Sequence, residues 1–222
     1  MLRPRKRITK REIKEDALVT NYFRLQKFAK RYEKQLNIVL VSIVLVAVVS
    51  ILMIRSKKKA ELTAASKFGI AEQFYYASDY ERSIHELTPI ADTYSGTRAA
   101  GRAVFYLANS YFFMNDFSNA EKYYRLYVDQ YDKKDLFYAS SLAGIGACLE
   151  SNNQYSQAAV MYEQAGKENA DSFKTPFYLR DAGRCFVLAG EKEKGKEIYK
   201  YIIDNYPTSD VKQEVMFLFE AL

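Results

Sequence analysis

SDYERS, residues 78–83, is the first of four similar turn segments that decide the fold of this chain. Its counterparts are NDFSNA at 115–120, NQYSQA at 153–158 and GEKEKG at 190–195. When the last residues of the four segments are aligned, the intervals between them are 37, 38 and 37 residues. A fixed period in this range indicates a solenoid, in which each repeat is a pair of helices that stacks on its neighbours.

Each unit also carries the interior pattern of a helix pair. A small residue stands twelve positions before the aligned residue, and a larger apolar residue stands four positions after it. The small residues are Ala71, Ala108, Gly146 and Gly183, and the larger ones are Leu87, Tyr124, Tyr162 and Tyr199. A small residue lets two helix backbones approach closely, and a large one fills the space beside them. The pattern predicts an all-α domain over residues 60–222, with helix pairs at 64–96, 101–133, 139–171 and 176–207.

The ends of the units carry signals of their own. Units one, two and four end in a tyrosine, at Tyr94, Tyr131 and Tyr206, and Pro176 opens unit four. The last stretch, 209–222, has N-cap candidates in Thr208 and Ser209. It presents one apolar face made of Val211, Val215, Leu218, Phe219 and Leu222. We expect a C-terminal capping helix over the open edge of the fourth repeat. A contact with a partner or a second copy is the alternative.

This register of small and large residues resembles the tetratricopeptide repeat family over about residues 64–207. The resemblance implies a solenoid of about four helix pairs whose first helices line a concave groove for partner proteins. Carried over by register, the groove residues are Phe68, Glu72, Tyr75, Tyr76, Phe105, Asn109, Phe112, Phe113, Arg180 and Arg184. Because aromatic rings and arginines dominate interface energetics, this set favours protein binding. The alternative is that about half of these rings are buried in the repeat core.

Before the repeats stands the apolar run LNIVLVSIVLVAVVSILMI, residues 36–54. It holds 14 Leu, Ile or Val residues and no charge, with Lys34 before it and Arg55 and Lys57 after it. A helix of this length spans about 28 Å, close to the thickness of the hydrocarbon core of a bilayer. We predict a transmembrane helix. The run is longer than the apolar region of a usual signal peptide, so we expect it to stay in the mature protein.

Charge is distributed unequally along the chain. Residues 1–59 carry 16 Lys or Arg against 4 Asp or Glu, and residues 60–222 carry 17 against 23. The basic excess therefore belongs to the membrane end, where anionic lipid headgroups attract it, and the acidic repeat domain argues against nucleic acid as a partner.

Residues 1–35 form a basic segment ahead of the predicted span. Thr9 followed by Glu12 is a capping-box signature, which predicts a helix that starts near Lys10. Its apolar residues recur at helical spacing, so we expect an amphipathic helix at the membrane surface; a solvated charged helix is the alternative. The tail before the span holds 12 Lys or Arg, and 5 follow within about 15 residues after it. The positive-inside rule thus places the amino terminus in the cytoplasm and the repeats outside it.

Little in the sequence suggests catalysis. The chain has one histidine, His85, with no cysteine or second histidine nearby to share a metal, so we expect a surface role for it. Cys148 and Cys185 occupy equivalent positions in units three and four. Equivalent positions lie about 8–10 Å apart in packed helices, too far for a disulfide. We predict two free thiols in the core, no catalytic or metal site and no cofactor.

The complete plan resembles the ancillary subunits of the bacterial Sec translocon, which are single-pass proteins with periplasmic tetratricopeptide repeats. The segment ITKREIKEDALVTNYF, residues 8–23, is similar to theirs as well. The resemblance implies an inner-membrane protein that binds translocon subunits, periplasmic chaperones or emerging unfolded chains. The alternatives are a scaffold for envelope assembly, a cytosol-facing organelle receptor if the orientation is inverted, and an enzyme whose site the sequence does not reveal.

Overall fold

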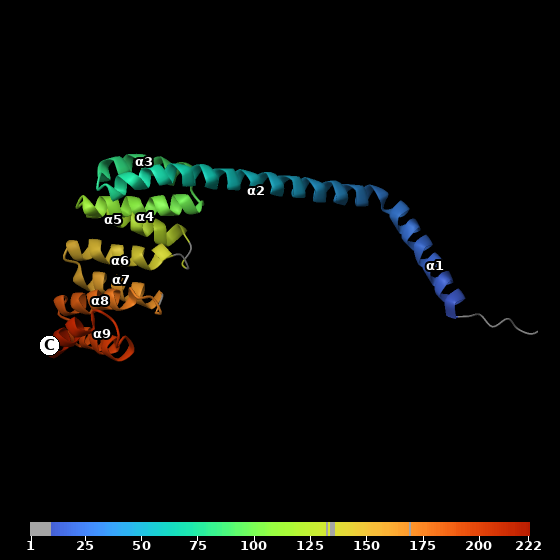
Figure 1. Ribbon diagram of the computed structural model, residues 1–222. Coiled ribbons are helices and arrows are strands. Elements are labelled where there is room, and N and C mark those ends of the chain that lie inside the picture. The colour runs from blue at the N-terminus through green and yellow to red at the C-terminus, as the bar shows by residue number, and fades with distance from the viewer. Residues whose placement is uncertain (1–9, 132, 134–135, 169) are drawn as a thin grey trace, which may run out of the picture. The chain divides into compact units, whose positions relative to one another are not determined.

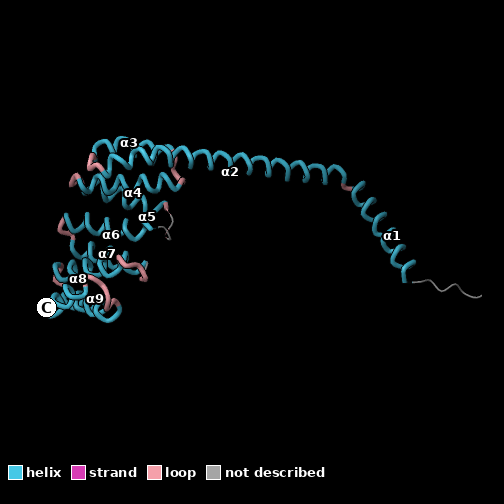
Figure 2. The backbone as a smooth tube through the Cα atoms, viewed as in Figure 1, coloured by secondary structure: helices cyan, strands magenta, loops and turns pink. Residues whose placement is uncertain are grey.

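The computed structural model describes residues 10–131, 133, 136–168 and 170–222, and all regular elements among them are α-helices (Figure 1 and Figure 2). The chain forms two compact units, residues 1–56 and 57–222. The second unit is a stack of helix pairs that follow one another in chain order. The helices are α1 (Lys10–Arg31), α2 (Glu33–Tyr76), α3 (Tyr80–Thr93), α4 (Arg98–Phe113), α5 (Phe117–Gln130), α6 (Leu136–Ser151), α7 (Tyr155–Glu168), α8 (Thr175–Leu188), α9 (Lys192–Asn205) and α10 (Lys212–Glu220). The solenoid predicted from the repeat pattern is confirmed.

The same tight turn joins the two helices of every pair. The second residue after each first helix has a positive φ: 59° at Ser78, 62° at Asn115, 59° at Asn153 and 84° at Gly190. The residue that follows donates its backbone N–H to a carbonyl five positions back, as Asp116 does to Tyr111 at 2.9 Å. Asp79 and Asp116 then cap their helices through side-chain oxygens. The period of the sequence is therefore also a period of backbone geometry.

Ser78→Gly should stabilise the protein, because Ser78 holds a left-handed backbone conformation (φ 59°) that glycine adopts without steric cost. We expect a gain of about 0.5–1 kcal/mol in the free energy of unfolding, measured by chemical denaturation in detergent micelles. Asn115→Gly is the matched control and should gain less, since asparagine tolerates this conformation better than serine. A loss of stability in the Ser78 variant would contradict the assigned turn geometry.

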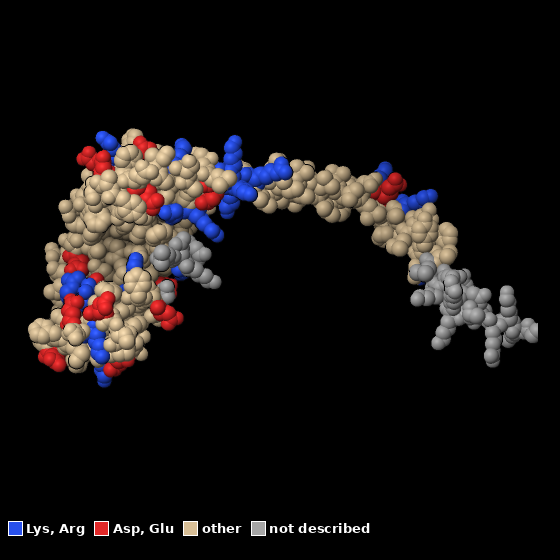
Figure 3. Space-filling view, viewed as in Figure 1, with Lys and Arg blue, Asp and Glu red and all other residues tan. Residues whose placement is uncertain are grey.

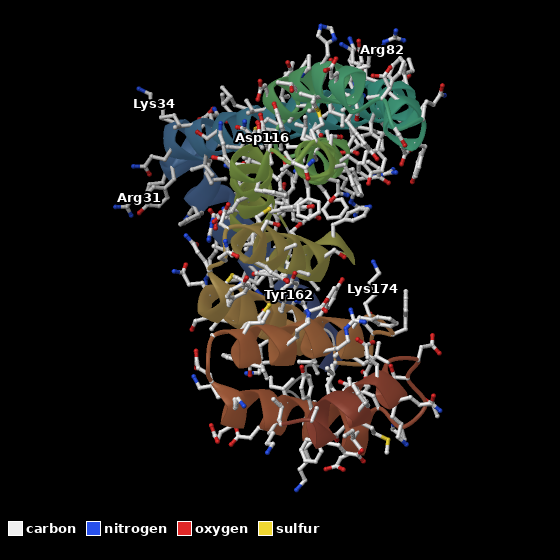
Figure 4. The ribbon with its side chains drawn as sticks, turned by 90° about the vertical axis from the view of Figure 1, so that its left-hand side faces the viewer. Arg31, Lys34, Arg82, Asp116, Tyr162 and Lys174 are labelled. Atoms are coloured by element: carbon white, nitrogen blue, oxygen red, sulfur yellow. The ribbon has the colours of Figure 1, made fainter. Side chains whose placement is uncertain are left out.

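The small and large residues of the repeat pattern meet inside the third and fourth pairs. Leu87, Tyr124, Tyr162 and Tyr199 are between 0% and 6% exposed. Figure 4 shows Tyr162 in the interior of the stack. A Cβ added to Gly146 would lie 3.1 Å from the Tyr162 ring, and one added to Gly183 would lie 2.5 Å from the Tyr199 ring. Glycine at these positions therefore sets how closely the two helices of a pair approach.

Some helix ends lie where the sequence predicted them, and others differ by a few residues. Tyr94, Tyr131 and Tyr206 are the C-cap residues of α3, α5 and α9, and Pro176 lies in the first turn of α8, as predicted. The helices α4 and α6 begin at residues 98 and 136, ahead of the expected 101 and 139. For α4 the reason is a cap, since the Thr97 hydroxyl accepts from the backbone N–H of Ala100 at 3.1 Å.

The cap predicted at Thr208 and Ser209 is wrong. The last helix begins at Lys212, and its N-cap is Val211, which makes no side-chain cap bond. Packing decides this start, because Val211 and Val215 are buried at 3% and 0% against α9. The predicted apolar face of α10 is confirmed, since Leu218, Phe219 and Leu222 pack partly against the same cluster.

The first unit contains α1 and the apolar part of α2. Helix α1 begins at Lys10, and Thr9 of the predicted capping box lies outside the described residues. The large apolar side chains from Ile38 to Ile54 are 46% to 68% exposed, so no described part of the protein covers them. Among the described residues, α2 alone is long and apolar enough to cross a membrane, although a signal sequence would meet the same criterion.

Candidate functional site

Five aromatic residues from α2, α3 and α4 form one cluster, which we call the aromatic surface: Tyr75, Tyr76, Tyr80, Tyr106 and Phe113. Tyr75 lies at its centre. Its ring centroid is 4.7 Å from that of Tyr106, 5.6 Å from that of Tyr76 and 5.9 Å from that of Tyr80. The ring of Phe113 stacks on that of Tyr80 at 5.2 Å. The structure thus brings together three of the predicted residues, Tyr75, Tyr76 and Phe113.

Two rings of the aromatic surface face solvent. Tyr76 is 69% exposed and Phe113 is 54% exposed, and the neighbouring Met114 is 42% exposed. The hydroxyls of Tyr76 and Tyr106 lie 3.0 Å apart, which ties α2 to α4 beneath this surface. Burial is the largest cause that raises the pKa of the Tyr75 hydroxyl, so this ring stays neutral at physiological pH. The aromatic surface is therefore an apolar contact area supported by polar groups below it.

The other predicted rings lie deeper. Phe68 is 2% exposed and belongs to the core, where the guanidinium of Arg102 lies 4.3 Å from its ring centroid. The ring of Phe105 stacks on that of Phe137 at 4.6 Å, and Phe112 packs edge-to-face on Phe117 at 5.4 Å. Phe105 and Phe112 are both half-buried. Phe68 is therefore not available to a partner, while Phe105 and Phe112 offer only part of their surface.

The polar residues predicted as groove residues in the first two pairs form hydrogen bonds with other side chains of the protein. Glu72 accepts a hydrogen bond from Arg102 at 3.0 Å, which links α2 to α4. The side-chain oxygen of Asn109 accepts the hydroxyl proton of Tyr124 at 2.6 Å, which fixes the ring of a core residue. These two side chains hold the stack together beside the aromatic surface.

Arg180 and Arg184 belong to what we call the charged network: Glu150, Arg180, Asp181, Arg184 and Glu214. Arg184 contacts both carboxylate oxygens of Glu150, with 2.9 Å from one guanidinium nitrogen to Oε2. Arg180 lies 2.9 Å from Asp181 and 3.2 Å from Glu214. The network joins α6, α8 and α10. The two arginines that the sequence predicted as groove residues are thus paired with carboxylates of their own chain.

Partial burial and the neighbouring charges shift the pKa values of the network residues. Burial acts to raise the pKa of Glu150, but the hydrogen bonds and the charge of Arg184 outweigh it and lower this pKa. Burial also raises the pKa of Asp181, and here the two arginines offset it only in part. The pKa of Arg184 is raised, first through its hydrogen bond to Glu150. With three carboxylates and two guanidinium groups, the network carries one net negative charge when all five are ionised.

The sequence reasoning missed Tyr80, Tyr106, Asp181 and Glu214 as members of these two clusters. A signal for the ion pairs was present, because Glu150 stands 34 residues before Arg184 and Glu214 stands 34 residues after Arg180. Residues spaced by about one repeat lie on neighbouring first helices. Opposite charges at that spacing therefore predict an ion pair across two repeats.

Groups with chemical reactivity lie elsewhere. Cys148 and Cys185 are free and buried, as predicted, and burial is the main cause that raises each thiol pKa to about 12. His85 lies at the surface, where its side chain is 82% exposed and contacts Glu86 at 3.1 Å. No group of three metal-binding side chains occurs among the residues that the structure describes.

Comparison with known proteins agrees with this geometry. The tetratricopeptide repeat family model matches residues 102–133 and 180–209, which are the pairs α4–α5 and α8–α9. These two segments are similar to tetratricopeptide repeats. Among solved structures, a single-substitution variant of a Podosopora anserina protein, described as a kinesin light chain with nearly identical TPR-like repeats, matches 66% of this chain and 76% of its own, with a TM-score of 0.54 and 12% identity. The form without the substitution covers 63% and 72%, with a TM-score of 0.52 and 12% identity. No curated protein sequence matches the chain.

The helix stack carries two different surfaces. The aromatic surface belongs to the first two helix pairs, and the charged network belongs to the last two and to α10. On the face drawn in Figure 3, Lys or Arg and Asp or Glu side chains lie next to one another over the lower helices. Over the upper helices, charged side chains surround a mainly uncharged area. Tetratricopeptide repeats are a protein-interaction scaffold.

Proposed function

We propose that this protein is a membrane-anchored interaction module that binds partner polypeptides on its aromatic surface. The observation that carries the proposal is the exposure of Tyr76 (69%) and Phe113 (54%) on the first helices of a protein-interaction fold. Contiguous exposed apolar surface in a soluble domain marks an interaction site, and aromatic rings supply most interface energy. Tyr75, Tyr76, Phe113 and the exposed parts of Phe105 and Phe112 form the proposed contact area, and Phe68 supports it from the core.

The apolar part of α2 supports the membrane anchor. Its large apolar side chains from Ile38 to Ile54 are 46% to 68% exposed. An uncharged surface of this length is stable in a bilayer and not in water. Lys34, Arg55 and Lys57 flank it at the depth where anionic headgroups attract cations.

The accessory role at the Sec translocon is the finer part of the proposal. It is supported by the order of a basic tail, an apolar helix and an acidic repeat domain, which resembles the ancillary translocon subunits. In this role the amino terminus is cytoplasmic and the repeats are periplasmic. An anchor beside an exit site raises the effective concentration of the aromatic surface for emerging segments or for periplasmic chaperones.

Site-specific photocrosslinking tests the proposal. A photoreactive phenylalanine analogue at Phe113, incorporated into the full chain in cells, should crosslink to protein partners several-fold more than the same analogue at His85. The His85 side chain is 82% exposed on α3 and lies outside the aromatic surface, so it controls for random encounters. Adducts that contain translocon subunits support the translocon role, and adducts with other envelope proteins support an assembly scaffold instead. Equal labelling from both positions, or none from Phe113, would refute the interaction surface.

A further inference from the structure

We propose that the segment bound by this protein carries one large apolar side chain and one Lys or Arg side chain, spaced by about six to seven residues. The apolar side chain contacts the aromatic surface, and the cation contacts Asp181 and Glu214 in the charged network. The inference rests on the proposed function and adds the chemistry of the ligand.

The charged network favours a cation because its carboxylates outnumber its arginines. Arg184 is engaged by both oxygens of Glu150, and Arg180 is shared between Asp181 and Glu214. In the contacts among the described residues, Arg180 binds Oδ1 of Asp181 and Oε2 of Glu214. The second oxygen of each carboxylate can accept a hydrogen bond from a bound ligand. An ammonium or guanidinium group adds favourable interactions there without breaking a pair. An anionic group meets three carboxylates and two arginines that are already engaged.

The accessible geometry agrees with this assignment. The side chain of Glu214 is 53% exposed, and those of Arg180 and Asp181 are 25% and 22% exposed. A ligand therefore reaches Glu214 directly and Asp181 behind it. The domain as a whole is acidic, with 23 Asp or Glu against 17 Lys or Arg over residues 60–222. This balance steers cationic segments toward it and repels acidic ones.

The first helix of the third pair separates the two ends of the proposed site. The register positions of α6 that correspond to Phe105 and Asn109 hold Ala143, which is 9% exposed, and Ala147, which is half-buried. The sole charged residue of α6 is Glu150. Small side chains leave room for the backbone of a bound segment. Two steps between neighbouring first helices, from α4 to Asp181 on α8, span about 20 Å. The long side chain of a Lys or Arg covers the remaining distance to Glu214 on α10. An extended chain advances about 3.3 Å per residue, so the apolar and the cationic side chain of the ligand are about six residues apart. If the ligand crosses the helices obliquely, the spacing is about seven residues.

Fluorescence anisotropy with synthetic peptides tests the inference on the full chain in mild detergent. The probe is a labelled peptide in which one Phe and one Arg are separated by five Gly or Ser residues. The comparison peptide has Glu in place of Arg. We expect the Phe/Arg peptide to bind about tenfold more tightly than the Phe/Glu peptide, and this preference to weaken as salt is added.

Charge reversal locates the cation site. Glu214→Lys should weaken binding of the Phe/Arg peptide roughly fivefold and strengthen binding of the Phe/Glu peptide. Glu214→Gln, which removes the charge without adding one, should have a smaller effect of the same sign. Glu193→Lys is the matched control, since Glu193 is exposed on α9 and lies outside the network. Circular dichroism of each variant verifies that the helices are retained.

Three results would overturn the inference: equal or tighter binding of the Phe/Glu peptide, equal effects of the Glu193 and Glu214 reversals, or no binding of either peptide. If photocrosslinks from Phe113 are still obtained in those cases, the proposed function stands and only the ligand chemistry fails. If the photocrosslinks are absent as well, both proposals fall.

Discussion

Gly183→Ala is expected to lower the melting temperature of the protein by about 4–8 °C, because the added methyl group overpacks a filled core. The added Cβ would lie 2.5 Å from Cε1 and 2.8 Å from Cδ1 of Tyr199. The Tyr199 ring is 2% exposed, so it can move aside only by displacing the residues packed around it. Overpacking of this kind costs about 1–3 kcal/mol. The measurement is thermal unfolding of the full chain in detergent micelles, followed by far-UV circular dichroism.

Gly69→Ala is the matched control for this substitution. Gly69 lies inside α2, and an added Cβ there would meet nothing within 4 Å. Alanine favours a helix over glycine by about 0.5–1 kcal/mol, so this variant should be slightly more stable than the parent. Gly146→Ala should fall between the two, since its Cβ would lie 3.1 Å from the Tyr162 ring. An equal effect at all three glycines would show that helix propensity, and not the approach of paired helices, controls stability.

Val44→Arg combined with Val48→Arg should release the protein from membranes. Each arginine at the centre of a span costs about 2.5–3.5 kcal/mol, whereas the 14 Leu, Ile and Val residues together gain very roughly 4–8 kcal/mol. Two substitutions therefore cancel most of the gain from insertion. Carbonate extraction of membranes measures the result: we expect the parent chain in the pellet and the double variant mainly in the supernatant.

Val44→Leu with Val48→Leu is the control for this experiment, because it changes the same positions and keeps the segment apolar. It should remain in the membrane pellet. The intact mass of the extracted parent adds a second readout, since removal of the apolar run as a signal sequence would shorten the chain. A parent that carbonate extracts completely, or that has lost residues 36–54, would contradict the anchor.

Local chemistry explains why so much of the fold was predictable. The turn at Ser78, Asn115, Asn153 and Gly190 repeats because each first helix must end in a left-handed residue before the chain reverses. The pairing of Gly183 with Tyr199 is similarly local, since the two helices that meet are consecutive in the chain. Such features depend on a few neighbouring residues, and a sequence period reveals them directly.

The start of α10 and the burial of Phe68 were not predictable in this way. Thr208 and Ser209 have the side chains of N-caps, but the burial of Val211 at 3% fixed a later start. Phe68 fits the register of a groove residue, yet it is 2% exposed in the core and packs edge-to-face on Tyr106 at 5.3 Å. In both cases packing against a residue from another helix outweighs the local preference.

By itself the sequence determined an all-α repeat solenoid with a 37–38-residue period, its turns, its two buried thiols and its long apolar helix. Only the tertiary structure decided which rings reach solvent and which charges are already paired. The reason is that Tyr75 with Tyr106, and Arg184 with Glu150, join residues 31 and 34 positions apart on different helices. Their contacts depend on how neighbouring repeats stack, and residue type does not specify that.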